Sequence, residues 1–145
     1  MENPREWTLG AQKLRFEPPD TFWVEFQGKV SLEEARLLVD VYRERGTSAP
    51  FFVVVDLRGV PRMDEEVQRY FSDHAEPAWL LGNVLIGARL AHKAAAKGVL
   101  LAAWLTGRAE RHELSKVHFA SSLAEASEIV ARLRARLGGK LPSLG

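Results

Sequence analysis

The stretch PFFVVVDLRGVPRMDEEVQRYF, residues 50–71, decides the fold of this chain. Phe51 to Val55 are consecutive apolar residues rich in β-branched types, a pattern that predicts a strand buried on both faces. We expect this strand to stop at Asp56 and a loop to follow from Leu57 to Arg62. Gly59 and Pro61 in that loop are residues typical of turns.

A helix should follow the loop. It has an acidic start at residues 64–66 and should reach about His74, because apolar residues recur at helical spacing. These residues are Met63, Val67, Tyr70 and Phe71. Polar side chains therefore gather where a strand ends and a helix begins, which is where open α/β sheets hold their sites.

The chain before this stretch predicts two strands and one helix. The segments 7–16 and 21–27 flank a turn with two prolines and should form an antiparallel hairpin. Ser31 and Glu34 have the spacing of a capping box at a helix start, and Gly46 is a natural C-cap. We expect Leu32, Ala35, Leu38, Val39 and Tyr42 on the buried side of this helix.

The chain after this stretch predicts two more strand–helix pairs. We expect strands at Asn83–Ala88 and Val117–Ala120, and a helix at Arg89–Leu105. Ser121 or Ser122 should cap a last helix, which ends at Gly138–Gly139. The buried stripe of this helix should be Leu123, Ala126, Val130, Leu133 and Leu137.

This order predicts one α/β domain over residues 1–137, with a flexible tail at 138–145. An N-terminal hairpin should precede a βαβαβα series whose mostly parallel central sheet is flanked by helices. The 145 residues, 46% hydrophobic and 27% charged, suit one ordinary globule. The chain has no Cys, no signal-peptide core and no apolar run of membrane-spanning length, so we expect a cytoplasmic protein.

The segment VVVDLRGVPRMDEEV, residues 53–67, resembles the signature of STAS domains, the SpoIIAA-like anti-sigma-factor antagonists. In that family a strand ends in Asp, a short loop follows, and a Met/Ile-Asp pair precedes Ser-Ser-Gly at a helix start. Asp56 and Met63–Asp64 match without a gap. The element order and the strand-Gly-Ala-Arg junction at residues 87–89 resemble a divergent bacterial group, whose superfamily includes CRAL-TRIO lipid carriers.

The resemblance implies a STAS-type fold, but the chain departs from the family where the switch serines stand. Glu65 and Glu66 occupy the two serine positions, and Val67 occupies the glycine position. The second serine is the family's phosphorylation switch, and Glu66 cannot be phosphorylated. One interpretation is that Glu66 mimics a permanently phosphorylated state, although a carboxylate carries one charge and a phosphate nearly two.

The leading hypothesis is a non-enzymatic regulatory domain, resembling anti-sigma-factor antagonists, that binds a partner protein. The contact surface would comprise Asp56, Arg58, Arg62, Asp64, Glu65 and Glu66. A structural interpretation competes with it. Acidic residues at a helix start stabilise the helix by about 0.3–1 kcal/mol per charge through its macrodipole. Asp56 can likewise cap the loop that follows it.

The alternative hypothesis is a small carrier or sensor of an apolar, lipid-like ligand. The second half of the helix at 89–105 is apolar nearly all round, so it should be covered. Ordinary core packing, or a dimer contact, is the simpler interpretation. In the carrier hypothesis, the ligand pocket would involve Gly87, Arg89, Leu90, Leu101 and Trp104.

The sequence gives little support for other classes of function. The four histidines are dispersed without metal-ligand spacing, and no nucleophile or phosphate-loop motif occurs, so we predict no metal, no cofactor and no enzymatic activity. Arg132 and Arg136 share a helix side, but the net charge of +1 argues against nucleic-acid binding. Homodimerisation is a further hypothesis, because four Trp residues and an apolar helix offer hydrophobic surface.

Overall fold

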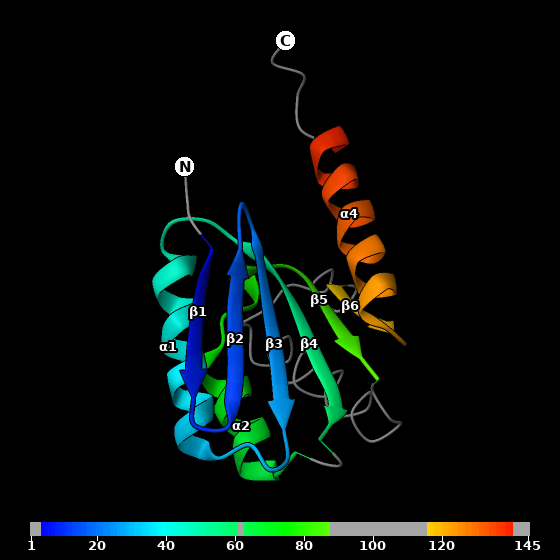
Figure 1. Cartoon of the computed structure of the whole chain (residues 1–145). Helices are drawn as coiled ribbons and strands as arrows, with labels where there is room; N and C mark the ends of the chain where they lie inside the picture. The colour runs from blue at the N-terminus through cyan, green and yellow to red at the C-terminus, as the bar shows by residue number, and fades with distance from the viewer. Residues whose placement is uncertain (1–3, 61–62, 88–115, 141–145) are drawn as a thin grey trace.

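Six strands form one sheet in the order β1-β2-β3-β4-β5-β6, with helices on both faces (Figure 1). This computed structural model describes residues 4–60, 63–87 and 116–140. The strands are β1 (Arg5–Leu9), β2 (Gln12–Glu17), β3 (Thr21–Gln27), β4 (Phe51–Gly59), β5 (Leu80–Ile86) and β6 (Val117–Ala120). The helices are α1 (Leu32–Gly46), α2 (Glu65–His74), the 3-10 turn η1 (Pro77–Trp79) and α4 (Leu123–Lys140).

The sheet is antiparallel from β1 to β3 and parallel from β3 to β6. The predicted α/β class with an antiparallel N-terminal element and parallel strands behind it is therefore confirmed. The expected strand Val117–Ala120 is present with the same bounds, at the edge of the sheet. The expected helix Arg89–Leu105 lies outside the described residues.

The prediction of a single strand over residues 7–16 is wrong, because the chain reverses inside that segment. Gly10 and Ala11 join β1 to β2, with Leu9 paired to Gln12. Gly10 has φ +65°, which is the glycine position of a two-residue type II′ turn. The expected hairpin is thus a meander of three antiparallel strands.

The capping box at the start of α1 is confirmed. Ser31 Oγ accepts a hydrogen bond from the Glu34 amide at 3.1 Å, and Glu34 Oε1 accepts one from the Ser31 amide at 2.8 Å. Ala35, Leu38, Val39 and Tyr42 are buried as predicted, but Leu32 is exposed. Gly46 is the last helical residue rather than the C-cap, and a Cβ there would lie 2.4 Å from Trp79 Cδ1.

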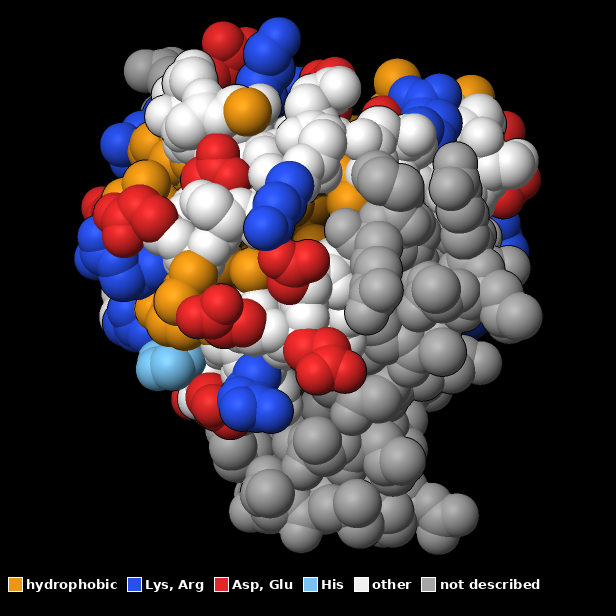
Figure 2. All heavy atoms as spheres, turned by 90° about the horizontal axis from the view of Figure 1, so that it is seen from below, with side chains coloured by type: hydrophobic (Ala, Val, Ile, Leu, Met, Phe, Trp, Pro, Cys, Tyr) orange, Lys and Arg blue, Asp and Glu red, His pale blue; other side chains and the backbone are white. Residues whose placement is uncertain are grey.

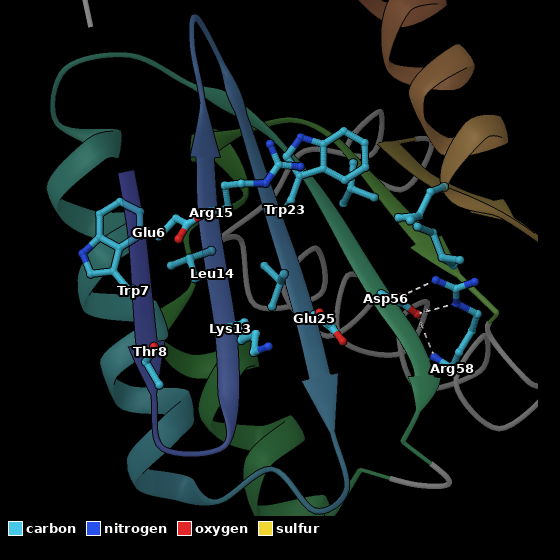
Figure 3. A pocket seen from close by; sticks show the side chains of 14 residues that line it. Glu6, Trp7, Thr8, Lys13, Leu14, Arg15, Trp23, Glu25, Asp56 and Arg58 are labelled. Atoms are coloured by element: carbon cyan, nitrogen blue, oxygen red, sulfur yellow. Dashed lines mark hydrogen bonds and ion pairs between the residues drawn. The ribbon is translucent and has the colours of Figure 1, made fainter. Parts of the chain in front are cut away.

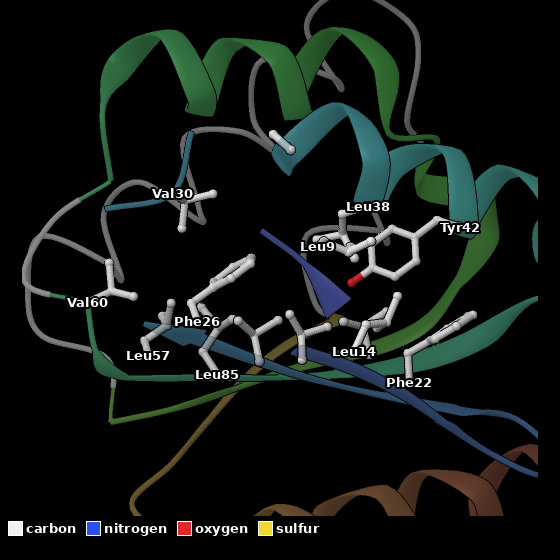
Figure 4. Close-up of a cluster of buried hydrophobic side chains, with 14 of the residues drawn as sticks. Leu9, Leu14, Phe22, Phe26, Val30, Leu38, Tyr42, Leu57, Val60 and Leu85 are labelled. Carbon is white, nitrogen blue, oxygen red and sulfur yellow. The ribbon is translucent and has the colours of Figure 1, made fainter. Parts of the chain in front are cut away.

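The central strand β4 is buried on both faces, as its apolar run predicts. Phe51, Val53 and Val55 belong to the core beneath α1 and α2. Figure 4 shows this core, with Leu57 of the same strand. Phe52 and Val54 face a second core beneath α4. The expected end at Asp56 is wrong: β4 continues to Gly59, because Glu25 pairs with Asp56 and Gln27 pairs with Gly59.

The bounds of β5 differ from the prediction at both ends. β5 begins at Leu80 and includes Gly82, where a Cβ would lie 3.0 Å from Leu133 of α4. That glycine is therefore needed for helix packing inside the strand and does not precede it. The strand ends before Gly87, whose φ of +67° turns the chain away.

The last helix, α4, is capped at Ser122, whose Oγ accepts a hydrogen bond from the Glu125 amide at 3.1 Å. Ala126 and Val130 are buried and Leu133 packs against the second core, but the expected burial of Leu123 and Leu137 is wrong. The C-terminal turns of α4 extend past the sheet, where Leu137 is exposed, and Leu123 is exposed at the first residue of the helix (Figure 1). It also continues through the two glycines to Lys140, past its predicted end.

Candidate functional site

The parallel strands β3, β4 and β5 all end at the same edge of the sheet, below the centre of Figure 1. The helices α1 and α2 begin at this edge, after β3 and β4. Viewed from that side, the described part of the molecule has acidic, basic and apolar side chains interspersed, with no large patch of one sign (Figure 2). This edge holds most of the residues that were predicted from the sequence to bind a partner protein.

Asp56 and Arg58 form a closed pair at the end of β4 (Figure 3). Arg58 Nε donates to Asp56 Oδ1 at 2.9 Å, Arg58 Nη2 donates to Oδ2 at 2.7 Å, and the Arg58 amide donates to Oδ1 at 3.0 Å. The side-chain hydrogen bonds from Arg58 hold the pKa of Asp56 below its ordinary value, although partial burial opposes this. The pair therefore organises the strand end and keeps Asp56 ionised.

Gly87 leaves room for this pair. A Cβ on Gly87 would lie 2.4 Å from Arg58 Cγ, so the stem of Arg58 passes directly over the glycine. Of the five residues predicted to line an apolar ligand pocket, only Gly87 is described. Arg89, Leu90, Leu101 and Trp104 lie outside the described residues, so the carrier hypothesis stays a prediction.

The acidic side chains at the start of α2 do not cap the helix in the way that the structural interpretation predicts. Asp64 is the N-cap residue, but its side chain accepts no hydrogen bond from the helix amides. It forms an ion pair instead with Lys29 Nζ at 3.2 Å, in the loop between β3 and α1. Glu65 and Glu66 are exposed, and neither side chain forms a hydrogen bond or ion pair with another described residue.

The six residues predicted to bind a partner therefore do not form one cluster. The side chains of Asp56 and Arg58 lie on the sheet face that α4 partly covers. Asp64, Glu65 and Glu66 begin α2, which packs with α1 on the opposite face. Arg62 lies outside the described residues. These two groups lie at the same edge of the sheet, but on its opposite faces.

A groove that was not predicted from the sequence lies on the sheet face opposite α1 and α2 (Figure 3). Its volume is about 560 Å³, and it is open to solvent. We call it the open-face groove. The side chains on this face that line it are Glu6, Thr8, Lys13, Arg15, Trp23, Glu25, Val54, Asp56, Arg58, Ile86 and Leu123.

Strand alternation was the available signal for this groove. Lys13 and Arg15 alternate with buried residues of β2, and Trp23 and Glu25 alternate with buried residues of β3, so all four share one face. The sequence did not show that α4 leaves this part of the face uncovered. A buried polar atom belongs to the same region: Trp23 Nε1 has no hydrogen-bond partner among the described residues.

His118 on β6 faces α4, on the same side of the sheet as the buried Ala120. Burial lowers the pKa of His118, and the charges of Arg136 and Arg132 lower it further. Within the described residues, no group of three or more His, Asp or Glu side chains is arranged to hold a metal ion. No described helix has the length and apolar character needed to cross a membrane.

Comparison with known proteins rests on structure alone. No protein-family model matches the chain, and no curated protein matches it. Among solved structures, it is similar to an uncharacterised protein of the DUF3478 family from Shewanella loihica PV-4, described as having a SpoIIAA-like fold. The TM-score is 0.54 at 12% sequence identity, over 82% of this chain and 91% of that chain. This chain has a SpoIIAA-like fold.

The SpoIIAA-like fold confirms the architecture that the resemblance of residues 53–67 implied. At 12% identity the likeness shows the fold and does not transfer a function. Within this fold Glu65 and Glu66 form the first turn of α2, directly after the loop that follows β4. The helix start where the resemblance places the switch serines is therefore present, and it carries two free carboxylates among the described residues.

Proposed function

We propose that this protein is a non-enzymatic, STAS-like regulatory domain that binds a partner protein at the start of α2 and the adjoining end of β4. The observation that supports the proposal best is the state of Glu65 and Glu66. Both are exposed in the first helical turn, and no described residue neutralises either charge. Asp64 extends this acidic surface and is held by Lys29.

The helix itself favours these charges. Unpaired amides at the start of α2 carry partial positive charge, which stabilises nearby carboxylates by about 0.3–1 kcal/mol each without neutralising them. A partner with a complementary basic surface would gain in association rate and in specificity from this arrangement. Because a carboxylate needs no kinase, we propose that the surface is permanently charged and that binding does not depend on phosphorylation.

The end of β4 supplies the second part of the proposed surface. The Asp56–Arg58 pair fixes the backbone that leads from the strand into the loop. The Arg58 side chain is half exposed, so one face of its guanidinium is available to a carboxylate or carbonyl of the partner. Arg62 is part of the same proposal, since it lies in the segment between Arg58 and Asp64.

The test compares neutral isosteres of the two key residues with a matched control. The purified chain is used as bait for proteins of its own cell, and the affinity of any captured protein is measured by calorimetry. The Glu65→Gln/Glu66→Gln variant should bind about tenfold more weakly or worse, as expected for loss of charge pairs at an interface. Glu44→Gln, an exposed position on α1, should bind like the wild type.

Salt dependence gives a second readout, because the proposed contact is electrostatic. Wild-type affinity should fall as salt rises, and the double variant should lose most of that dependence. The proposal is wrong if Arg58, Asp64 and Glu65 can all be changed to Ala with no loss of affinity for a partner that the wild-type chain binds.

A further inference from the structure

The described residues cover only half of the sheet face opposite α1 and α2. α4 packs over β4, β5 and β6 through Ala126 and Val130, and the adjoining strands carry the open-face groove (Figures 1 and 3). Three strands spaced about 4.8 Å apart span about 14 Å, and a helix with its side chains is about 10–12 Å wide. The half of this face that no described residue covers therefore has room for one helix beside α4.

The groove has the side chains of a protein interface. The Arg15 guanidinium lies 5.3 Å from the centre of the Trp23 ring, and Trp and Arg are the residue types most enriched at interface hot spots. Lys13 is paired in register with Glu25 across β2 and β3 but forms no ion pair with any described residue. The groove thus presents an aromatic anchor beside a free cation.

α4 forms a ridge beside the groove. The side of this helix that faces away from the sheet carries mostly small side chains. Ala124, Glu128, Ala131 and Ala135 are exposed, and at about 100° per residue they lie roughly opposite the buried Ala126 and Val130. Surface helices usually carry long polar side chains there. Leu123, 50% exposed, stands at the rim of the groove. This side of α4 can approach another sheet closely, because helix packing distance follows the size of the side chains at the contact.

A groove and a helix that would fill such a groove therefore stand side by side on one face. A two-fold dimer needs this kind of self-complementary surface, in which each copy supplies both parts. We infer that a second copy of this chain docks on this face, so that α4 of each copy lies in the open-face groove of the other.

The geometry of that dimer follows from the two-fold axis. The axis runs parallel to α4, and the two α4 helices lie next to each other between the two sheets. The outward side of α4, with Glu128 at its centre, then faces Lys13 of the other copy, whereas Arg15 is already paired with Glu17 at 3.2 Å. Glu128 forms no ion pair with a described residue of its own chain, so its charge is available for this contact.

This inference does not depend on the carboxylates of the proposed partner site, although Asp56 and Arg58 belong to both surfaces. The carboxylates at the start of α2 lie in the layer on the other side of the sheet. A chain that fails to dimerise can still bind a partner through α2, and a dimeric chain can fail to do so. The two experiments therefore fail independently.

The test measures the mass of the full chain in solution by sedimentation equilibrium across the micromolar range. We expect a dimer for the wild type and a monomer for Ala131→Arg, because a long side chain on the outward side of α4 cannot enter the groove. Position 131 is exposed, so the variant should keep its fold, checked by circular dichroism. Glu44→Arg on the exposed side of α1 is the matched control and should remain dimeric.

A charge exchange tests the orientation of the two copies. Glu128→Lys should weaken the dimer about tenfold, because it places a cation against Lys13. Adding Lys13→Glu to the same chain should restore it. A wild type that is monomeric throughout overturns the inference, and the groove would then fit a helix of a different protein. A dimer that Ala131→Arg and Glu128→Lys leave unchanged also overturns it, because that dimer uses another surface.

Discussion

Removal of the Arg134 side chain should detach the C-terminal helix from the start of β3. Arg134 Nε donates to Asp20 Oδ2 at 3.0 Å, Arg134 Nη2 donates to Oδ1 at 2.6 Å, and Nη2 also lies 3.2 Å from Thr21 Oγ1. These bonds join α4 to the turn between β2 and β3, far away in the sequence. The pKa of Arg134 is raised, first by its hydrogen bond to Asp20, so the guanidinium stays charged.

The size of the effect follows from the geometry and the exposure of the pair. Exposed ion pairs contribute about 0.2–1 kcal/mol, and hydrogen bonds to charged groups contribute about 1.5–3 kcal/mol when they are shielded. Asp20 is 18% exposed but Arg134 is 45% exposed, so solvent screening places this pair between the two classes. Contact of the guanidinium with the Phe52 ring, 5.8 Å from its centre, adds about 0.5 kcal/mol. We expect Arg134→Ala to lower the free energy of unfolding by about 1–2 kcal/mol.

Urea denaturation of the wild type, Arg134→Ala, Asp20→Asn and the double variant gives the coupling between the two side chains. The coupling should be about 1 kcal/mol, and the single variant should lower Tm by about 2–8 °C. Arg132→Ala is the matched control, because Arg132 forms no ion pair with a described residue, and it should stay within about 0.5 kcal/mol of the wild type. A coupling of zero, or equal losses from Arg132→Ala and Arg134→Ala, would refute the reasoning.

Two further predictions concern single positions. Gly46→Ala should destabilise the protein by about 1 kcal/mol although alanine favours helices, because its Cβ would meet the Trp79 ring at 2.4 Å. Gly138→Ala on α4, where a Cβ meets nothing within 4 Å, is the control and should not destabilise in the same urea titration. Burial raises the pKa of Glu34, but hydrogen bonds from backbone amides outweigh it and hold the pKa below its ordinary value. Its contribution to stability is therefore present at neutral pH and lost as the pH falls through the folded pKa, so Glu34→Gln should cost most at pH 7 and least at ~pH 3. A cost that does not change with pH would contradict this assignment.

The elements that could be predicted were those whose signals are local. The capping box of α1 needs only Ser31 and Glu34, three residues apart, and it is present. The apolar run from Phe51 to Val55 predicted a strand buried on both faces, and β4 contacts both cores. The turn at Gly10–Ala11 was missed because a single glycine is a weak turn signal, and its support comes from a distant residue. Glu34 Oε2 accepts a hydrogen bond from the Ala11 amide at 2.9 Å.

The candidate sites were harder to predict, because they depend on which element covers which face. The exposed carboxylates at the start of α2 could be found from sequence, since a helix start and its acidic residues lie together in the chain. The open-face groove could not, because its residues come from β1 to β5 and α4. Their alternation shows only that they share a face. Whether that face is covered depends on the path of α4, and the apolar stripe from Leu123 to Leu137 wrongly predicted cover along its whole length.

The change from apolar to charged residues at Asp56 has a different cause from the one that the sequence suggested. On the face toward α1, β4 stays apolar from Phe51 through Leu57, because that face is covered along its length. On the face toward α4, the series runs from Phe52 and Val54 to Asp56 and Arg58. The strand itself continues to Gly59. Asp56 therefore marks the position where the cover of α4 gives way to the groove, and it does not mark the end of the strand. A sheet is thus partly covered where the residues on one face of a strand change from apolar to charged while the other face stays apolar. In this chain that change locates the rim of the surface on which we place the second copy.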